Sequence, residues 1–238
     1  MASTSRPLRG AKAHMMPATR TVLADQAYES VRALVMDNAL DPGSRVGIDS
    51  LARDLGVSQT PMREALARLE ADGLLTREAL RGYSVAPLLN RRQLDELFEF
   101  RLRLEPWATG RAAERITSEG RAQLKRELKS RHIVPDGHSY EDYKAAIAHD
   151  QRLHQLLFDL AGNTIMAQAF ERVHCHLHLY RLCYRSDIST LTADEHRRIT
   201  SAVIDGHPEA ACEAMKDHLK RSRGRLADVL DTGEIVAS

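Results

Sequence analysis

The sequence predicts a mostly α-helical protein with two domains: an N-terminal winged helix-turn-helix of three helices plus a β-hairpin wing, and a C-terminal all-α bundle of about six helices. Two observations lead to this prediction. Over residues 21–87, three helical patterns separated by glycine-containing turns are followed by two short strand patterns. Over residues 91–232 no convincing strand pattern follows, and capping or breaking residues divide the helical stretches. A chain of 238 residues is long enough for two such domains.

Composition narrows the class of protein. The apolar stretches are too short to span a membrane and the first twenty residues lack an apolar signal segment, so we expect a cytoplasmic protein with no membrane partner. The three cysteines, Cys175, Cys183 and Cys212, form no C-x-x-C pair and suit reduced thiols. Eleven histidines, beside only four phenylalanines and one tryptophan, exceed what a core requires.

Residues 1–20 form a basic arm. Arg6, Arg9, Lys12 and Arg20 all precede the first acidic residue, Asp25. A solvated, unstructured terminus is the favoured interpretation, and an arm that touches DNA phosphates is the alternative.

The first two helices of the head are bounded by turn and capping residues. Apolar residues recur at helical spacing from Leu23 to Val35, and the pattern stops at Asp41-Pro42-Gly43, where a turn is favoured. A second short helix follows Asp49 or Ser50 as N-cap and ends at Gly56, which suits a left-handed C-cap.

The third helix and the wing follow directly. Ser58 is a good N-cap, Pro61 is tolerated in the first turn, and the helix ends near Asp72-Gly73. Residues 74–86 then predict two short strands around Leu80-Arg81-Gly82, which is typical of a hairpin with a glycine at its tip. Helix, helix, turn, helix and hairpin together make a winged helix-turn-helix.

The start of the third helix carries side chains suited to DNA. Ser58, Gln59, Thr60 and Arg63 lie at the end that such a helix inserts into the major groove. Hydroxyl groups and helix N–H groups bind phosphates, glutamine pairs with adenine, and arginine pairs with guanine. The same residue types also suit a solvated helix face, so spacing alone leaves both interpretations open.

A family resemblance favours the DNA-binding interpretation. DPGSR at residues 41–45, LARDLGVSQTPMREALARLEADGLL at residues 51–75 and RGY at residues 81–83 resemble the DNA-binding domain of the GntR family, over residues 21–87. The V-S-x-T-P-x-R-E-A-L run with the downstream R-G is far more specific than a generic helix-turn-helix pattern.

The resemblance implies particular DNA contacts. Residues matching Ser58, Thr60 and Arg63 contact DNA in that family, and the tip matching Arg81-Gly82 enters the minor groove. Apart from the resemblance, Arg45 could support the backbone contact, although an exposed arginine in a turn is common. This chain has Gln59 where the family usually has arginine. The loss of a cation predicts weaker binding or a preference for an adenine-containing step, so the operator sequence does not carry over from the family.

The second domain offers a constellation of metal-binding residue types. Asp150 and His154 lie four residues apart on one helix face, with Cβ atoms about 6 Å apart, although such a pair is also common on surfaces. His196 and His218 lie on two later helices, so four ligands from three helices could meet inside a bundle. One aspartate and three neutral imidazoles suit zinc, nickel, manganese or a similar divalent ion.

The same region resembles the FCD ligand-binding domain of the FadR-type branch of the GntR family, over residues 91–232. FRLRLEPWA, DQRLHQLLFDLAGN, DEHRRITSAVIDG and PEAACEAMKDHL carry this resemblance. It implies metal ligands at Asp150, His154, His196 and His218, with zinc the first expectation. About six helices place the chain nearer the smaller, VanR-like version of the domain than the seven-helix version.

Arg101 matches a family residue that lies beside the metal and holds a carboxylate effector. A guanidinium grips a carboxylate through two hydrogen bonds while the metal takes another oxygen, so a small organic acid could bind both. Pairing of Arg101 with Glu105, four residues on, is an alternative that does not exclude this role.

Other histidines are discounted as ligands. Alternate residues of a helix point in different directions, so only His174 and His178 of the run His174, His176, His178 share a face and could line the pocket; a partly exposed or interdomain position is favoured. His149 points about 100° away from Asp150 and is not expected to be a ligand.

These inferences predict a homodimeric regulator that binds a palindromic operator in double-stranded DNA. A small carboxylate effector at the metal site would change its DNA affinity, most simply by relieving repression. A regulator that responds to metal alone is an alternative. A metalloenzyme is disfavoured, because the sequence shows no general base or nucleophile constellation and an enzyme would leave the recognition helix unexplained.

Overall fold

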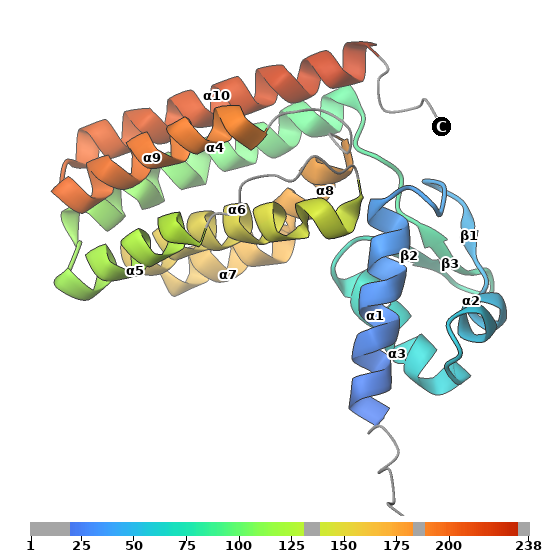
Figure 1. Cartoon of the computed structure of the whole chain (residues 1–238). Helices are drawn as coiled ribbons and strands as arrows, with labels where there is room; N and C mark the ends of the chain where they lie inside the picture. The colour runs from blue at the N-terminus through green and yellow to red at the C-terminus, as the bar shows by residue number, and fades with distance from the viewer. Residues whose placement is uncertain (1–19, 131–138, 183–188, 233–238) are drawn as a thin grey trace, which may run out of the picture.

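The computed structural model describes residues 20–130, 139–182 and 189–232. Figure 1 shows two bodies within these ranges: a small head, built from the first three helices and a sheet, and an elongated bundle formed by the remaining helices. The mostly helical fold class predicted from the sequence is confirmed. No helix in these ranges is long and apolar enough to cross a membrane.

The head is a winged helix-turn-helix. It contains α1 (Arg20–Met36), β1 (Arg45–Val46), α2 (Ile48–Asp54), α3 (Gln59–Ala71), β2 (Leu75–Glu78) and β3 (Gly82–Val85). The strands form an antiparallel sheet in the order β1-β3-β2. The predicted hairpin is β2 with β3, and β1 is an additional two-residue strand that the sequence did not reveal. Val31 and Val35 of α1 pack with Leu66 and Leu69 of α3 in the core of the head.

The second helix begins earlier than predicted. Its N-cap is Gly47, without a side-chain capping bond, and Ser50 lies inside the first turn, where its hydroxyl donates to the Gly47 carbonyl. The Asp49 carboxylate accepts a hydrogen bond from Gln59 instead of capping the helix, with Nε2 and Oδ1 2.7 Å apart. Both candidate caps are therefore occupied with other partners.

The third helix matches its prediction at both ends. Ser58 is its N-cap in extended conformation, and Pro61 lies in the first turn, where no backbone partner is lost. Asp72 is the C-cap, and Gly73 follows with a φ of 73°, a left-handed conformation that favours glycine.

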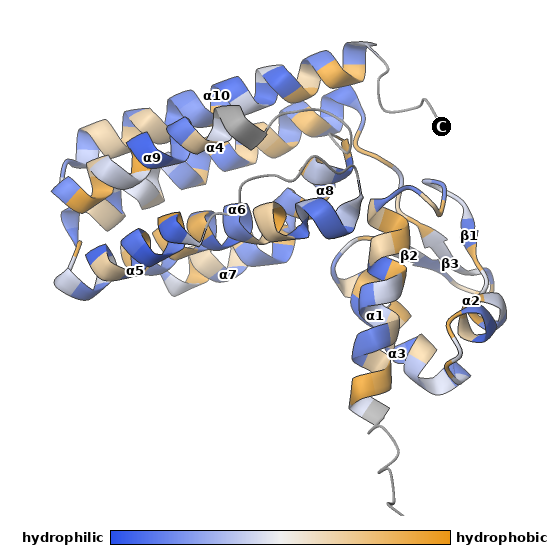
Figure 2. Ribbon diagram, in the orientation of Figure 1, coloured by the Kyte–Doolittle hydropathy of each residue, from blue (hydrophilic) through white to orange (hydrophobic). Residues whose placement is uncertain are grey.

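The bundle consists of α4 (Arg91–Glu114), α5 (Ser118–Lys129), α6 (Tyr140–Ala161), α7 (Thr164–Val173), α8 (Cys175–Leu182), α9 (Ser189–Asp205) and α10 (Pro208–Thr232). Figure 2 shows hydrophobic and hydrophilic patches alternating along each of the long helices, as expected of amphipathic helices. Their apolar faces form a core that includes Phe98, Leu153, Ile199, Met215 and Leu219.

The described part of the bundle has seven helices where about six were expected. His174, with a φ of 47°, adopts a left-handed conformation that separates α7 from α8, where no break was expected between residues 164 and 182. The helix count therefore no longer favours the smaller, VanR-like version of the domain.

The head and the bundle share a hydrophobic core. Tyr140 and Ile147 of α6 and Leu177 of α8 belong to the same buried cluster as the apolar side chains of the head. Directly after α1, the Asp37 carboxylate accepts a hydrogen bond from the backbone N–H of Tyr140 across 2.5 Å. The first turn of α6 is thus packed on the head.

Two sequence predictions concern residues that lie partly outside the described ranges. Of the basic arm, only Arg20 is described, where α1 begins. Cys175 and Cys212 are free thiols, as expected, whereas Cys183 lies outside the described residues.

Candidate metal centre and DNA interface

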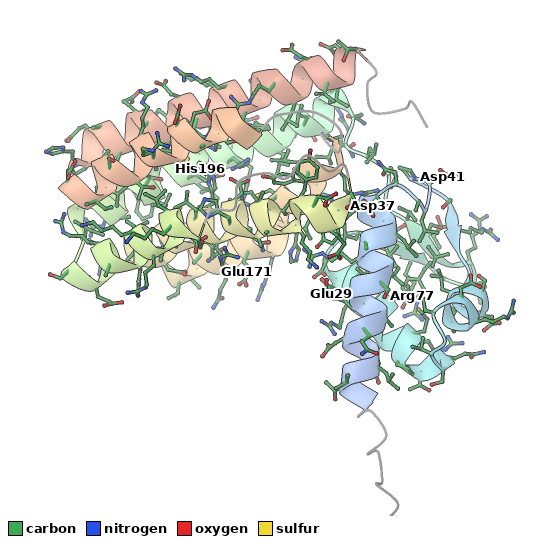
Figure 3. All side chains as sticks on the ribbon, in the orientation of Figure 1. Glu29, Asp37, Asp41, Arg77, Glu171 and His196 are labelled. Carbon is green, nitrogen blue, oxygen red and sulfur yellow. The ribbon has the colours of Figure 1, made fainter. Side chains whose placement is uncertain are left out.

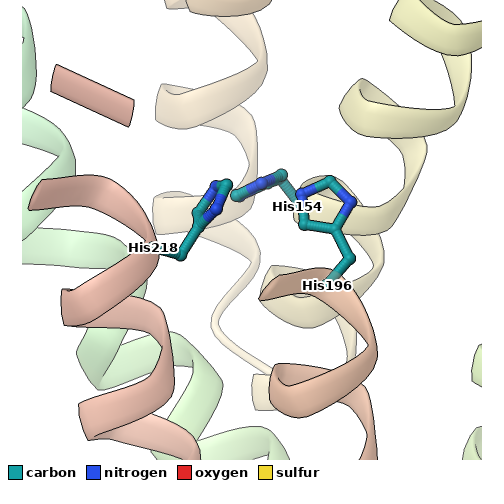
Figure 4. A group of neighbouring side chains, drawn as sticks. All are labelled: His154, His196 and His218. Carbon is teal, nitrogen blue, oxygen red and sulfur yellow. The ribbon is translucent and has the colours of Figure 1, made fainter. Parts of the chain in front are cut away.

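Three histidines meet in the interior of the bundle. His154 of α6, His196 of α9 and His218 of α10 are 1%, 3% and 3% exposed. Figure 4 shows their rings converging from three helices, and Figure 3 shows His196 in the interior of the bundle. One ring nitrogen from each lies within 4.8 Å of the other two. The helices therefore bring together three of the four ligands predicted from the sequence.

Asp150 supplies the fourth. Its Oδ1 atom lies 3.1 Å from Nε2 of His196 and 3.6 Å from Nε2 of His154. Ligand atoms around a tetrahedral ion with bonds of about 2.1 Å are about 3.4 Å apart, so these separations match a shared ion closely.

Unpartnered polar atoms provide a test of whether the residues suit a metal. The Nε2 atoms of His154 and His176 are buried, and no residue in the described ranges forms a hydrogen bond with them. Buried polar nitrogens without a partner are rare in proteins, and a bound ion is one of the few explanations. The donor set and its geometry fit a divalent cation.

Carboxylates orient two of the rings. Glu105 contacts Nδ1 of His154, and Oε2 of Glu195 lies 2.8 Å from Nδ1 of His218. A carboxylate at Nδ1 favours the tautomer with its proton on that atom and leaves the lone pair on Nε2 for a metal. Arg225 donates to both oxygens of Glu195 at 2.8 and 3.0 Å and so fixes the carboxylate in turn.

His149, which was not expected to be a ligand, is held in the same manner. Its Nδ1 atom lies 2.8 Å from Glu127, which also accepts hydrogen bonds from Arg152, and its Nε2 atom is buried without a hydrogen-bond partner among the described residues. Its ring centroid is 6.0 Å from that of His196. His149 therefore lies at the edge of the cluster.

Arg101 forms the intrahelical pair that the sequence offered as an alternative. Its guanidinium contacts the Glu105 carboxylate, and the side chains are 2% and 0% exposed. Burial on its own raises the pKa of Glu105, but Arg101 and then His154 more than offset it and hold the pKa well below its usual range. The carboxylate is therefore ionised and orients the arginine as well as the histidine.

The protonation states suit metal binding. Burial lowers the pKa of His218 to about 4 and that of His176 to about 3, so both rings are neutral near pH 7. Burial raises the pKa of Asp150, but His176, His196 and His154 together lower it well below its usual range. His176 and His218 thus present neutral imidazoles beside the ionised carboxylate of Asp150.

His176 is the member of the cluster that sequence reasoning missed. It is 2% exposed, and one of its ring nitrogens lies within 4.8 Å of ligand atoms of Asp150 and His154. The left-handed residue His174 interrupts the helix and resets the direction in which each following side chain points. The inward direction of His176 could be predicted only if a new helix were taken to begin at Cys175.

The other two histidines of the run lie toward the head. Nε2 of His174 is 4.0 Å from the carboxylate of Asp72, and the ring of His178 lies beside Gly73, where an added Cβ would be 3.1 Å from its Nε2 atom. The favoured interdomain position fits both contacts.

The predicted DNA-contacting residues share one property, which is that all are exposed: Arg45, Ser58, Gln59, Thr60, Arg63, Arg81 and Gly82. Gln59 is held in place from two sides. It donates to Asp49, and its Oε1 atom accepts from Arg63 at 3.5 Å. The start of α3 and the tip of the wing are therefore accessible to DNA.

A winged helix-turn-helix with an exposed recognition helix, joined to a helical bundle that buries a polar cluster, defines a DNA-binding transcription regulator. The chain belongs to the bacterial regulatory proteins of the gntR family. The model of that family matches residues 23–85, and the model of the FCD domain matches residues 96–221. This confirms the predicted family and the FadR-type architecture, which is that of a transcription regulator and not of an enzyme.

Related proteins agree with this assignment. The chain is 29% identical over 211 residues to the uncharacterized HTH-type transcriptional regulator YdhC of Bacillus subtilis, covering 88% of this chain and 93% of the relative. It is 27% identical over 190 residues to the Nta operon transcriptional regulator of Aminobacter aminovorans, covering 79% and 87%. The solved structure of McbR/YncC from Escherichia coli has the same fold, with a TM-score of 0.64 at 22% identity over 87% of this chain and 97% of that one.

Proposed function

We propose that this protein is a homodimeric repressor whose operator affinity is controlled by a small carboxylate effector bound at a divalent metal ion, with zinc as the first candidate. Residues 21–87 would form the DNA-binding domain and residues 91–232 the sensor. The observation that carries the proposal is the buried convergence of Asp150, His154, His196 and His218, with a buried, unpartnered ring nitrogen on His154.

The four side chains would hold the metal as one carboxylate and three imidazole ligands. When bound, the metal supplies a positive centre that accepts an oxygen of a carboxylate. Arg101 would supply the second contact to the same carboxylate. Glu105 already contacts Nε and Nη2 of this arginine, so the effector would have to approach the remaining guanidinium nitrogen.

The DNA-binding half of the proposal rests on exposed side chains at two places. Ser58 and Thr60 would bind phosphates, and Gln59 and Arg63 would reach base edges in the major groove. Arg45 would support the backbone contact, and Arg81-Gly82 at the wing tip would enter the minor groove. Two copies related by a two-fold axis would read a palindrome.

Fluorescence anisotropy with a labelled promoter fragment tests the proposal. The protein is titrated with chelator present, with zinc, nickel or manganese present, and with zinc plus each of a panel of small carboxylates. A severalfold loss of DNA affinity with a particular acid, only when metal is present, is expected. A shift with metal that none of the acids alters further would favour the metal-responsive alternative, and no shift under any condition would exclude a sensor role.

A matched pair of variants links the effect to the site. Asp150→Asn removes the carboxylate from the cluster, whereas Asp159→Asn makes the same change on the exposed part of α6. We expect the first variant to lose the response to acid and the second to keep it. Size-exclusion chromatography with light scattering tests the dimer.

A further inference from the structure

The short helix α8 lies at the end of the bundle that faces the head (Figure 1). We propose that His176 is an additional protein ligand of the metal, and that α8 thereby couples the metal centre to the C-terminal end of the recognition helix α3. This inference rests on the proposed metal site and adds a residue and a route of regulation to it.

His176 lies beside the carboxylate of Asp150. Its Nε2 atom is 3.6 Å from Oδ2 of Asp150, whereas the other oxygen, Oδ1, faces His196 and His154. The carboxylate therefore lies between His176 on one side and His154 and His196 on the other. An ion bound beside this carboxylate would have His176 within reach. The His176 and His154 ring centroids are 5.0 Å apart.

His176 is also held as a ligand must be. Its ring meets Phe170 edge-on, with centroids 5.8 Å apart, and is fully enclosed by the bundle. Its Nε2 atom has no hydrogen-bond partner among the described residues, which is costly for a buried polar atom. A metal ligand bond would satisfy it.

The other face of α8 contacts the head. Leu177 belongs to the hydrophobic core of the head. Arg181, only 1% exposed, donates from Nη2 to the backbone carbonyl of Ala86 across 2.7 Å, directly after β3. A movement of α8 would therefore disturb both the core of the head and its connection to the bundle.

The same face reaches α3 through the two neighbouring histidines. His178 lies against Gly73, and His174 approaches Asp72, the C-cap of α3. The alternating run thus divides its contacts: His176 points to the metal centre, and the residues two positions before and after it point to the recognition helix.

The chain can reorient α8 independently of α7. His174 adopts a left-handed conformation between the two helices, so hydrogen bonding is not continuous across the junction. A ligand bond to His176 would favour the α8 position that brings Nε2 to the ion. Because the coupling of two binding events is reciprocal, operator binding should change metal affinity by the same factor as metal changes operator affinity.

Cobalt spectroscopy of the full chain tests whether His176 is a ligand. In His176→Cys a thiolate–cobalt charge-transfer band should appear that is absent in the wild type, because thiolates are strong ligands of soft and borderline metals. His174→Cys, two residues away, should show no such band. His176→Gln should weaken zinc binding about tenfold or more, the effect expected when a site loses a supporting group. Wild-type zinc affinity in His176→Gln and no new band in His176→Cys would overturn the assignment.

A double titration tests the coupling. Operator affinity is measured with zinc-loaded and chelator-treated protein, and zinc affinity with and without operator. In the wild type we expect zinc to change operator affinity, and operator to change zinc affinity, by the same factor of about fivefold or more. In His176→Gln, the change in operator affinity at saturating zinc should fall below about twofold. His178→Gln should keep wild-type zinc affinity but show a smaller change in operator affinity on addition of zinc.

The outcomes separate this inference from the proposed function. If wild-type operator affinity does not depend on zinc, the coupling is wrong, while the response to carboxylates can still be present. If zinc changes the operator affinity of His178→Gln as much as that of the wild type, the route through α8 is wrong. If the wild type does not bind zinc, nickel, manganese or cobalt, both the metal site and the inference fail.

Discussion

The Arg101–Glu105 pair allows a quantitative test of how the bundle interior is built. Both side chains are fully enclosed, and Glu105 also contacts Nδ1 of His154. Glu105→Gln preserves shape and one hydrogen-bond acceptor but leaves the guanidinium buried without a counter-charge. Breaking a buried ion pair in this manner costs about 3–5 kcal/mol. We therefore expect a loss of that size in the free energy of unfolding of the bundle.

The same helix contains a matched control. Glu99 and Arg103 have the same four-residue spacing on α4, but their side chains are 68% and 77% exposed. Exposed pairs of this kind contribute about 0.5 kcal/mol or less, so Glu99→Gln should be nearly neutral. Urea unfolding followed by far-ultraviolet circular dichroism, with chelator present throughout, measures both variants. A difference of less than about 1 kcal/mol between them would refute the claim that burial makes the Glu105 carboxylate essential.

Three further outcomes are expected. Removing zinc with a chelator should lower the melting temperature by several degrees, and adding zinc back should restore it, because a ligand that binds only the folded state stabilises it; an unchanged calorimetric midpoint would argue against a metal site. Gln59→Arg should raise operator affinity and steepen the dependence of log Kd on log salt by about one, as measured by anisotropy at several salt concentrations. An unaltered slope would mean that residue 59 does not approach a phosphate. Gly43→Ala, at a φ of 79° with nothing within 4 Å of the added Cβ, should cost about 1–2 kcal/mol, and Gly73→Ala should cost more, because its Cβ also meets His178. Equal urea-unfolding losses would show that the His178 contact is not tight.

Local signals were sufficient for much of the head. Ser58 and the Asp72-Gly73 pair mark the ends of α3 because helix boundaries depend on residues close in the sequence, although Ser58 occupies the N-cap position without a side-chain capping bond. The start of α2 was predicted late because Asp49 forms its bond with Gln59, ten residues away. Strand β1 was missed because two residues carry no periodicity, and their partners lie at the far end of the head.

In the candidate site, too, residues on one helix could be predicted, whereas contacts between helices could not. Asp150 and His154 could be paired from their spacing on one helix. His196 and His218 were candidates on two later helices, and the family resemblance implied the same four positions. Sequence spacing could not show that Glu195, adjacent to His196, orients His218 on another helix. The contribution of His176 was hidden by a single left-handed residue, which no helical periodicity can anticipate.

The shared core between the head and the bundle means that the two regions recognised by sequence comparison do not coincide with the units that fold. Tyr140, Ile147 and Leu177 belong to the bundle in sequence but complete the hydrophobic core of the head. A chimera that joins this head to another sensor at residue 90 would leave apolar surface of the head uncovered. Exchange of DNA-binding specificity between such regulators is therefore constrained by these three side chains as much as by the residues that touch DNA.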